Sequence, residues 1–352
     1  MLLGKQLLVK LRDMGIHRLC LPRALRCRDY LPQCVAVALL LGKYVLCSGG
    51  SGGRTILSDG NVELAFSTKE GNTCDAQLVK PNLCEKPLSI SLPLLDKPRF
   101  IIDLALWDSH TRSEKNELIE QVLASIVIIR KYLWDGNLEL TSVPSEFLEY
   151  LGRFAKGFIN KVVIKREGPV VGNDAVMLDP QGDCILDNSV INRYSTFIIG
   201  GIVDKERRVK GETARLYETL GLRVPRCRIE LRGSIVGVPD RINKIIEIIL
   251  RTLFETGDLE RSIIMAMSKK DRVNRLFYEI NKASYRIKIE NNVVLALTRS
   301  MIPRINWVNA SDDEIELAIR KSHVVIIEDQ ELNKYLTLNM ARPGPWTYKY
   351  VK

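Results

Sequence analysis

The sequence predicts an α/β protein whose central part holds a mostly parallel sheet. From Pro98 onward, short apolar runs alternate with stretches whose apolar residues recur at helical spacing, and this alternation is typical of strands joined by crossover helices. One apolar run ends directly in a glycine pair, FIIGG at 197–201. The 352 residues are enough for two or three domains, each with its own core.

The first segment, 1–96, is expected to form a small N-terminal domain. It is interrupted by SGGSGG at 48–53 and by four prolines between 81 and 98, which indicate turns and a linker rather than a long helix. Hairpin strands are expected around 54–66. The apolar run 34–41 is far shorter than the ~20 residues that cross a bilayer, so we expect a buried helix or strand and no membrane partner.

The central domain, expected at 97–257, opens with a buried strand in PRFIIDLAL. Thr111 and Glu114 form a capping-box pattern that begins a helix reaching Trp134. A last amphipathic helix is expected from Pro239, with Asp240 in its first turn, to about Glu255. The other expected elements are strands at 138–141, 161–164, 175–178, 195–199 and 226–231 and helices at 145–154 and 213–220.

The C-terminal domain, expected at 258–352, mixes charged helices with short strands at 292–297 and 323–327. Its tail, ARPGPWTYKYVK, is aromatic and basic. The aromatic residues Trp346, Tyr348 and Tyr350 beside Lys349 and Lys352 can stack on RNA bases and bind phosphates. A packed hydrophobic patch is the alternative for this tail.

Six of the eight cysteines lie in the first 84 residues, and no two form a CxxC pair. A zinc site is therefore not favoured, and no metal is expected. The seven-residue spacing of Cys20, Cys27 and Cys34 would place them along one helix face as buried thiols. One or two N-terminal disulfides remain an open alternative.

The formal net charge of +10 favours a polyanionic partner. The segment 205–232 alone holds nine Lys or Arg against four Glu. Neither a GxGxxG nor a GxxxxGK[ST] pattern occurs, which argues against a dinucleotide or P-loop site. The start, MLLGKQLLVKLRDMG, lacks the long apolar stretch of a secretory signal, so a cytoplasmic location is expected.

The most informative local pattern is FIIGGIVDKERR at 197–208. Its two glycines allow close approach of backbone to a ligand, and ligands bind beyond the carboxyl ends of strands in open α/β sheets. A carboxylate and several basic side chains follow the glycines. A tight turn with a solvated charged face is an equally good interpretation of the spacing alone.

Five segments carry a family resemblance: WDSHTRSEKNELIEQVLASIVIIRKYLWDGNLELTS, VMLDPQGD, YSTFIIGGIVDKERR, LGLRVPRCRIEL and VPDRINKIIEIIL. In this order they cover about 97–256, and they resemble the tRNA purine-9 N1-methyltransferases, in particular the archaeal branch of that family within the SPOUT superfamily. The resemblance implies a sheet with a C-terminal trefoil knot, flanked by smaller N- and C-terminal domains. It also implies S-adenosylmethionine as cofactor, tRNA as partner and a monomeric enzyme.

The resemblance assigns roles to individual residues. The implied cofactor-binding residues are Leu178, Asp179, Pro180, Gly200, Gly201, Ile202, Val203, Cys227, Ile229, Val236, Gly237 and Val238. Cys227 and Arg228 depart from the common eukaryotic pattern, which has a Leu-Pro pair there. The basic residues expected to bind RNA phosphates are Lys205, Arg207, Arg208, Lys210, Arg215 and Arg223.

For such a reaction, Asp204 is the first catalytic candidate. It can accept the N1 proton of guanine or offset the positive charge of a methylated adenine. An ordinary Asp, with a pKa near ~3.9, is a poor base for a weakly acidic ring proton, which slightly favours adenine. Further candidates are Asp103, Asp108 and Asp240, each of which can equally be a strand-end or helix-cap carboxylate.

Three other functions remain open at this point. A SPOUT methyltransferase can act on another RNA, such as rRNA, and a catalytically silent RNA-binding protein can use the same basic surface. A metal-dependent nuclease would need its carboxylates to converge in space. The residues available for that are Asp103, Asp108, Asp179 and Asp183.

Overall fold

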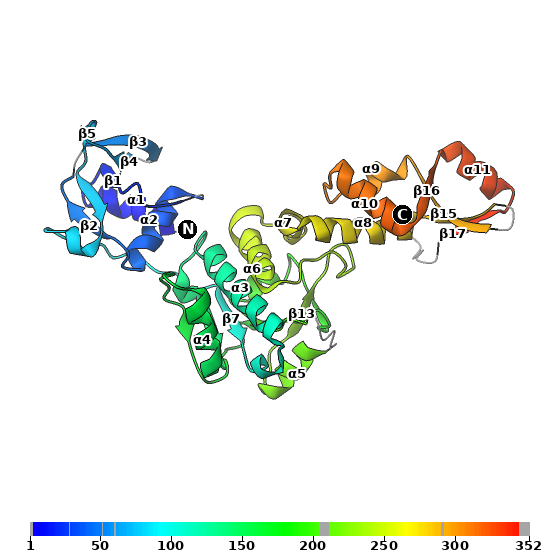
Figure 1. Cartoon of the computed structure of the whole chain (residues 1–352), viewed down its shortest axis with the longest axis horizontal. Coiled ribbons are helices and arrows are strands. Elements are labelled where there is room, and N and C mark those ends of the chain that lie inside the picture. The colour runs from blue at the N-terminus through cyan, green and yellow to red at the C-terminus, as the bar shows by residue number, and fades with distance from the viewer. Residues whose placement is uncertain are drawn as a thin grey trace. The chain divides into compact units, whose positions relative to one another are not determined.

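The computed structural model describes residues 3–27, 29–50, 52–59, 61–204, 211–289 and 292–344. The chain divides into two compact units, and Figure 1 shows its helices and strands. The first comprises Met1–Cys184, Ser189–Cys227 and Arg241–Leu250. The second comprises Ile185–Asn188, Arg228–Asp240 and Arg251–Lys352. In the described residues, no helix is both long and apolar enough to cross a membrane.

The N-terminal part of the first unit is a six-stranded sheet with two helices. The strand order is β2-β6-β1-β4-β3-β5, and β3 and β4 form the expected antiparallel hairpin. The apolar run at 34–41 lies largely in a helix. The elements are α1 (Leu3–Asp13), β1 (Arg18–Leu21), α2 (Leu31–Leu40), β2 (Val45–Ser48), β3 (Gly52–Asp59), β4 (Val62–Ser67), β5 (Asn72–Thr73) and β6 (Ala76–Val79).

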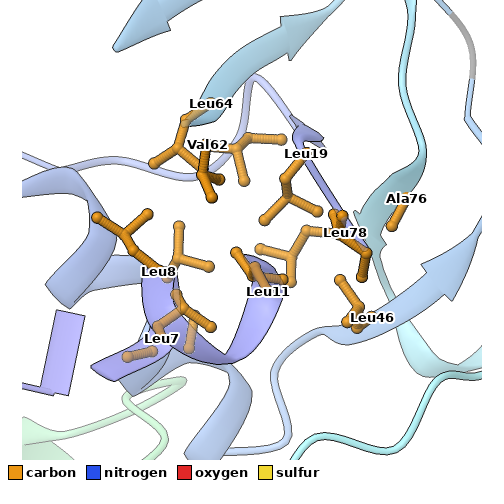
Figure 2. Packing of buried hydrophobic residues seen from close by; sticks show 14 of the residues in the cluster. Leu7, Leu8, Leu11, Leu19, Leu46, Val62, Leu64, Ala76 and Leu78 are labelled. Atoms are coloured by element: carbon orange, nitrogen blue, oxygen red, sulfur yellow. The ribbon is translucent and has the colours of Figure 1, made fainter. Parts of the chain in front are cut away.

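The core of this part is formed by the apolar face of α1 against the sheet (Figure 2). Leu7, Leu8 and Leu11 recur at helical spacing, so they share one face of α1. They pack in one cluster with side chains from β1 and β4, including Leu19 and Leu64. The charged residues of the helix are therefore left facing away from the core.

All eight cysteines are paired in four disulfides. The prediction that Cys20, Cys27 and Cys34 share a helix face is wrong, because Cys20 lies in β1, Cys27 in a loop and Cys34 in α2. Strand and loop geometry bring distant cysteines together, which spacing alone cannot reveal. The pairs are Cys20–Cys74, Cys27–Cys34, Cys47–Cys84 and Cys184–Cys227.

A seven-stranded sheet forms the centre, in the order β11-β13-β10-β12-β7-β8-β9. The pairings from β13 through β9 are all parallel, which confirms the predicted α/β class. Its strands are β7 (Arg99–Asp103), β8 (Leu138–Thr141), β9 (Val163–Ile164), β10 (Ala175–Leu178), β11 (Cys184–Leu186), β12 (Thr196–Gly200) and β13 (Arg226–Ile229).

The helices of this region are α3 (Arg112–Ile129), α4 (Ser145–Phe154), α5 (Glu212–Thr219) and α6 (Ile242–Arg251). The capping box of Thr111 and Glu114 is confirmed. The predicted start of the last helix is wrong, because α6 begins at Ile242 and leaves Asp240 exposed outside it. The backbone N–H of Ile242 donates to Oε1 of Gln121 at 2.9 Å, so a side chain from α3 satisfies the helix N-terminus.

Within its described residues, the second unit contains five α-helices and a four-stranded sheet in the order β16-β15-β14-β17. Ile287, Ala296 and Leu332 belong to one of its cores. The expected strands at 292–297 and 323–327 are present. The elements are α7 (Leu259–Ala266), α8 (Lys269–Ala283), β14 (Tyr285–Ile289), β15 (Asn292–Thr298), α9 (Met301–Ile305), α10 (Asp312–Ser322), β16 (Val324–Ile327), α11 (Asp329–Thr337) and β17 (Ala341–Pro343).

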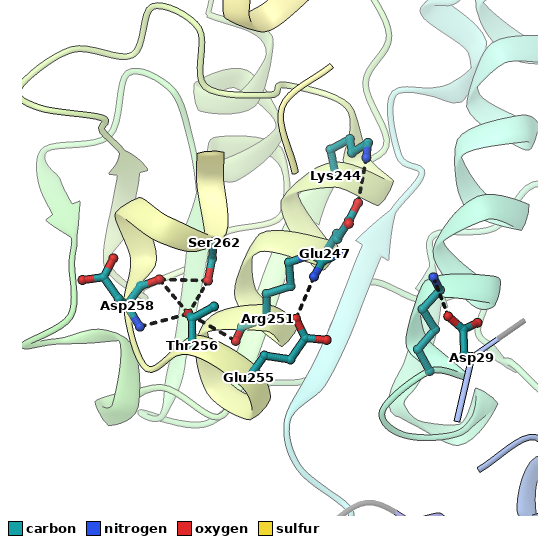
Figure 3. Close-up of polar contacts among 9 residues, drawn as sticks. Asp29, Lys244, Glu247, Arg251, Glu255, Thr256, Asp258 and Ser262 are labelled. Carbon is teal, nitrogen blue, oxygen red and sulfur yellow. Dashed lines mark hydrogen bonds and ion pairs between the residues drawn. The ribbon is translucent and has the colours of Figure 1, made fainter. Parts of the chain in front are cut away.

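Short helical turns occur between these elements. The π-turn after α6 ends at Gly257, whose φ of 65° is left-handed, and this favours glycine. The hydroxyl of Thr256 then donates to the carbonyl oxygen of Asp258 and lies 2.7 Å from the Ser262 hydroxyl (Figure 3). These turns are η1 (Pro81–Leu83), η2 (Trp107–Ser109), η3 (Asp135–Asn137), η4 (Ile191–Arg193) and η5 (Thr252–Thr256).

The disulfides that close longer loops should stabilise the N-terminal part more, with the logarithm of the loop length. The chain-entropy relation gives about 4 kcal/mol for Cys20–Cys74, with a sequence separation of 54, and about 2 kcal/mol for Cys27–Cys34, with a separation of 7. Denaturant unfolding of Cys20→Ser with Cys74→Ser, compared with Cys27→Ser with Cys34→Ser, measures this. Equal losses in the two variants would contradict the loop-length account.

Candidate active site at the carboxyl edge of the central sheet

The carboxyl ends of β7, β10 and β12 meet at one edge of the sheet. Gly200 lies opposite Asp103, and Leu178 lies opposite Ile199. The segments 178–180 and 200–203, predicted from separate motifs, therefore begin side by side. This is the edge at which open α/β sheets bind their ligands.

The two glycines at this edge are closely surrounded by the protein itself. The N–H of Gly201 donates to the carbonyl oxygen of Asp103 at 2.7 Å. A Cβ at residue 201 would lie 2.7 Å from that same oxygen and 2.6 Å from Leu104 Cδ2, and a Cβ at Gly200 would lie 2.7 Å from Ile202 Cδ1. The backbone of residue 201 lies so close to the end of β7 that only glycine fits there, whether or not a ligand binds.

Asp103 is buried and occupied by hydrogen bonds within the protein. Its Oδ2 accepts from the hydroxyls of Thr141 and Ser142, both at 2.7 Å. Its Oδ1 accepts from the N–H of Ala105 at 2.9 Å. Both carboxylate oxygens of Asp103 are therefore engaged within the protein. These contacts are those of a strand-end carboxylate, the alternative to a catalytic role that the sequence left open for this residue.

The loop after β10 is held firmly against β13. The N–H of Asp179 donates to the carbonyl oxygen of Cys227 at 3.0 Å, and the Asp179 carboxylate lies 3.4 Å from the guanidinium of Arg226. A Cβ at Gly182 would lie 2.6 Å from the Arg226 carbonyl oxygen. The disulfide between Cys184 and Cys227 closes the loop, so β11, which follows the predicted segment 178–180, is covalently joined to the predicted cofactor residue Cys227.

His110 holds the segment after β12, and the sequence analysis gave it no role. Its Nε2 lies 3.0 Å from the N–H of Val203, and its Nδ1 lies 3.0 Å from the carbonyl oxygen of Leu106. A backbone N–H can only donate, so Nε2 accepts and the proton sits on Nδ1. A buried neutral imidazole thus positions the residue that precedes Asp204.

The remaining predicted residues of the first unit are largely exposed. Asp204, Asp108 and Pro180 are exposed, whereas Val203 is buried. Arg215 on α5 and Arg223 also face solvent. Lys205, Arg207, Arg208 and Lys210 lie outside the described residues, as do Trp346, Tyr348, Lys349, Tyr350 and Lys352.

The last predicted cofactor segment belongs to the second unit and is held there by Arg275 of α8. This fully buried guanidinium donates from Nη1 to the carbonyl oxygen of Val236 at 3.0 Å and from Nε to Glu279 at 2.9 Å. Gly237 has φ of 80°, and a Cβ there would lie 2.6 Å from Arg275 Cβ. Val238 is half-buried and Ile229 is buried.

The opposite, amino edge of the sheet has a different character. Hydrogen bonds from Lys97 and Ser195 lower the pKa of Asp174 to about 2. A cavity of 460 Å³ lies beside it. Asp174 immediately precedes β10, so its contacts with Lys97 and Ser195 lie away from the carboxyl ends of the strands. We assign these contacts a structural role, in which they connect the residues that precede neighbouring strands.

The described residues hold no group of three or more His, Cys, Asp or Glu side chains that could bind a metal ion. Asp103, Asp108, Asp179 and Asp183 are all among those residues. Asp179 and Asp183 both lie 3.4 Å from the guanidinium of Arg226, but within the described residues they form no group of three ligands with a further carboxylate.

Comparison with known proteins identifies relatives of this chain. A curated Sulfolobus acidocaldarius protein named tRNA (adenine(9)-N1)-methyltransferase is 34% identical over 317 residues, which are 90% of this chain and 97% of that protein. A Thermococcus kodakarensis protein named tRNA (guanine(9)-/adenine(9)-N1)-methyltransferase is 31% identical over 76% of this chain and 74% of its own length. No protein-family model matches the chain.

Solved structures give the same result. Sulfolobus acidocaldarius Trm10 in complex with S-adenosylhomocysteine superposes with a TM-score of 0.68 and 29% identity, covering 91% of this chain and 99% of that one. A second structure of Sulfolobus acidocaldarius Trm10 has a TM-score of 0.54 and 34% identity, covering 75% and 97% of the respective chains. The parallel sheet and this likeness define an α/β methyltransferase fold.

Within that class, the family is determined by the curated relatives, which share about a third of their residues with this chain over most of its length. The chain belongs to the Trm10 family of tRNA position-9 N1-methyltransferases. The resemblance seen in the sequence is thereby confirmed.

Replacing Gly201 with Ala should destabilise the carboxyl edge by roughly 1 to 3 kcal/mol, because the new Cβ overlaps the Asp103 carbonyl oxygen. Gly152→Ala is the matched control. Gly152 is an exposed position inside α4 with nothing within 4 Å of its Cβ position, so alanine should stabilise the protein by about 0.5 to 1 kcal/mol. Denaturant unfolding of both variants decides; an unchanged midpoint for Gly201→Ala would refute the crowding.

Proposed function

We propose that this protein transfers the methyl group of S-adenosylmethionine to N1 of the purine at position nine of tRNA, in the cytoplasm. The observation that carries the proposal is family membership across 90% of the chain. It is an S-adenosylmethionine-dependent tRNA methyltransferase, with the carboxyl edge of the central sheet as its catalytic region. Adenine is the slightly favoured base and guanine the second.

The residues at the carboxyl edge fit this cofactor. Its adenine and methylene groups need apolar surface, which the half-buried Ile202 after β12 can supply, whereas Leu178 and Val203 are buried. Backbone groups of the loops can serve its polar atoms, and backbone contacts tolerate side-chain changes such as Cys227. The proposed cofactor residues are the twelve that the resemblance assigns, of which Leu178 is the first in the chain and Val238 the last. The trefoil knot is proposed for the C-terminal part of the sheet.

When bound, the cofactor supplies a methyl group on a positively charged sulfur, which is already strongly electrophilic. The protein's task is then to place N1 in line with that methyl group and to keep water away. His110 contributes by fixing the backbone at Val203. The rigid loop between Asp179 and Cys184 contributes by keeping the edge in one shape.

Asp204 is the proposed catalytic residue. It is exposed at the carboxyl edge, directly after the residue that His110 holds. Its proposed role is to offset the positive charge of the methyladenine, with acceptance of a guanine proton as the second possibility. Asp108 and Asp240 stay as secondary candidates, with Asp103 the weakest because its oxygens are occupied.

The target base lies in the folded core of tRNA and must leave its stack before N1 is reachable. Exposed Arg215 and Arg223, and the basic residues of 205–210, are proposed to bind backbone phosphates rather than to read bases. The enzyme is proposed to work as a monomer without a metal. Domain boundaries at 96 and 257 divide it into a central catalytic domain and two flanking domains that contact tRNA.

Methylation of tRNA transcripts that differ only at position nine tests the proposal. We expect labelled methyl transfer to transcripts with adenine, lower or equal transfer with guanine, and none with uracil. Mapping the methyl group to N1 by nuclease digestion and mass spectrometry completes the experiment. Equal labelling of all three transcripts would contradict the assignment of position nine.

Asp204→Asn separates the two roles of the carboxylate. If Asp204 offsets charge on adenine, single-turnover methylation should slow by less than the ~100- to 10,000-fold typical of lost general acid–base catalysis. Guanine transcripts should lose more than adenine transcripts wherever both are substrates, since an amide cannot accept the N1 proton. An unchanged rate on every accepted base would exclude Asp204 from the chemistry and shift attention to Asp108 and Asp240.

A further inference from the structure

The N-terminal sheet carries a cavity that no part of the proposed active site uses. It has a volume of 1080 Å³ and is lined by residues of β1 and the loop after it, of β3, of the end of β4 and the turn after it, and of β5. Among the described residues that line it, four are cations, Arg18, Arg23, Arg54 and Lys69, and one is a carboxylate, Glu70. We call it the basic groove.

The cations of the basic groove divide into two kinds. Arg18 is largely buried, forms an ion pair with Glu63 and donates to the carbonyl oxygen of Gly53 at 2.8 Å, so it is part of the structure. Arg23, Arg54 and Lys69 are exposed, and within the described part of the chain none of them forms an ion pair with a carboxylate. The three side chains Arg23, Arg54 and Lys69 are thus available to bind an anionic ligand in the groove.

Two glycines in the lining of the basic groove, Gly53 and Gly71, form what we call its floor and are tightly packed against the protein. A Cβ at Gly53 would lie 2.8 Å from Cys20 Sγ and 2.9 Å from Ala65 Cβ, and a Cβ at Gly71 would lie 2.6 Å from the Gly53 carbonyl oxygen. Gly71 has φ of 123°, a conformation that favours glycine. The disulfide between Cys20 and Cys74 lies beneath this floor, so the cations stand on a preformed surface.

We propose that the basic groove binds the phosphodiester backbone of a double-helical arm of the tRNA, remote from the methylated base. This rests on the proposed function. A surplus of exposed Arg and Lys fits a run of phosphates, and the hydroxyls of Ser67 and Thr68 with the amide of Asn72 add polar groups along the lining. The described lining contains no aromatic side chain, which argues against the stacked single strand that aromatic platforms bind.

The test compares two charge reversals of equal size in the same domain. Arg54→Glu with Lys69→Glu reverses the basic groove. Lys80→Glu with Lys86→Glu reverses two exposed lysines that do not line it and that follow β6, near the other end of the sheet. Binding of the substrate tRNA to the full chain is measured at several salt concentrations.

The groove variant should bind tRNA at least tenfold more weakly than the control variant. The slope of log affinity against log salt should fall by about 1.5 to 2, as expected for two lost phosphate contacts. Cofactor affinity, and the methylation rate at saturating tRNA, should match those of the control. Equal weakening in the two variants, or a loss of cofactor affinity in the groove variant alone, would overturn the proposal.

Two further results separate this proposal from the proposed function. Wild-type protein that binds tRNA through the basic groove but does not methylate it would refute the methyltransferase assignment alone. Wild-type protein that does not bind tRNA would overturn both. If the charge reversals prevent folding, Arg54→Gln with Lys69→Gln against Lys80→Gln with Lys86→Gln gives the same comparison, with about half the change in charge.

Discussion

The parallel pairing of β12 with β7 and β10 is the constraint on which the catalytic region depends. Parallel register brings Asp103, Leu178 and Gly200 to one edge of the sheet, although 97 positions separate the first of them from the last in the chain. The hydrogen bond from Gly201 to the Asp103 carbonyl oxygen extends this register by one residue. Only glycine permits that approach. Residue 201 is therefore fixed as glycine by the packing of the backbone, and it also lies in the proposed binding region.

The predicted cofactor segments of each unit are held by contacts that immobilise loops rather than by groups that act on a substrate. His110 binds the backbone of Val203, the Cys184–Cys227 disulfide ties the loop after β10 to β13, and Arg275 holds Val236 within the second unit. A methyl donor that is already electrophilic requires chiefly placement. A site composed of fixed backbone with few reactive side chains is consistent with that chemistry.

The elements that were predicted well are those whose pattern is local. Strands at 138–141 and 175–178 and the helix at 145–154 have the predicted bounds, because apolar runs and turn residues specify them within a few positions. The errors came from tertiary contacts. The first long helix ends at Ile129 rather than at Trp134, whose ring packs against the N-terminal core. The last helix of the central region, α6, begins only at Ile242, where the Gln121 side chain caps it.

The site shows the same division. Motif and resemblance singled out the segments at 178–180 and 200–203, and register places them together, although their role in binding remains a proposal. The pairing of Cys184 with Cys227 and the contact of His110 with Val203 could not be predicted, because each joins residues that are distant in sequence and that only the folded sheet brings together. Nothing in the sequence hinted at the disulfide, because Cys184 lies outside every expected strand and Cys227 lies at the start of the expected strand at 226–231.

The central claim, that the carboxyl edge of this sheet holds the cofactor, is tested most directly by hydrogen–deuterium exchange with and without S-adenosylhomocysteine. The account predicts slower amide exchange at 178–182, at 200–203 and around Cys227, with no change in the basic groove of the N-terminal sheet. Protection confined to other segments, or tight binding of S-adenosylhomocysteine that leaves these amides unaffected, would contradict it.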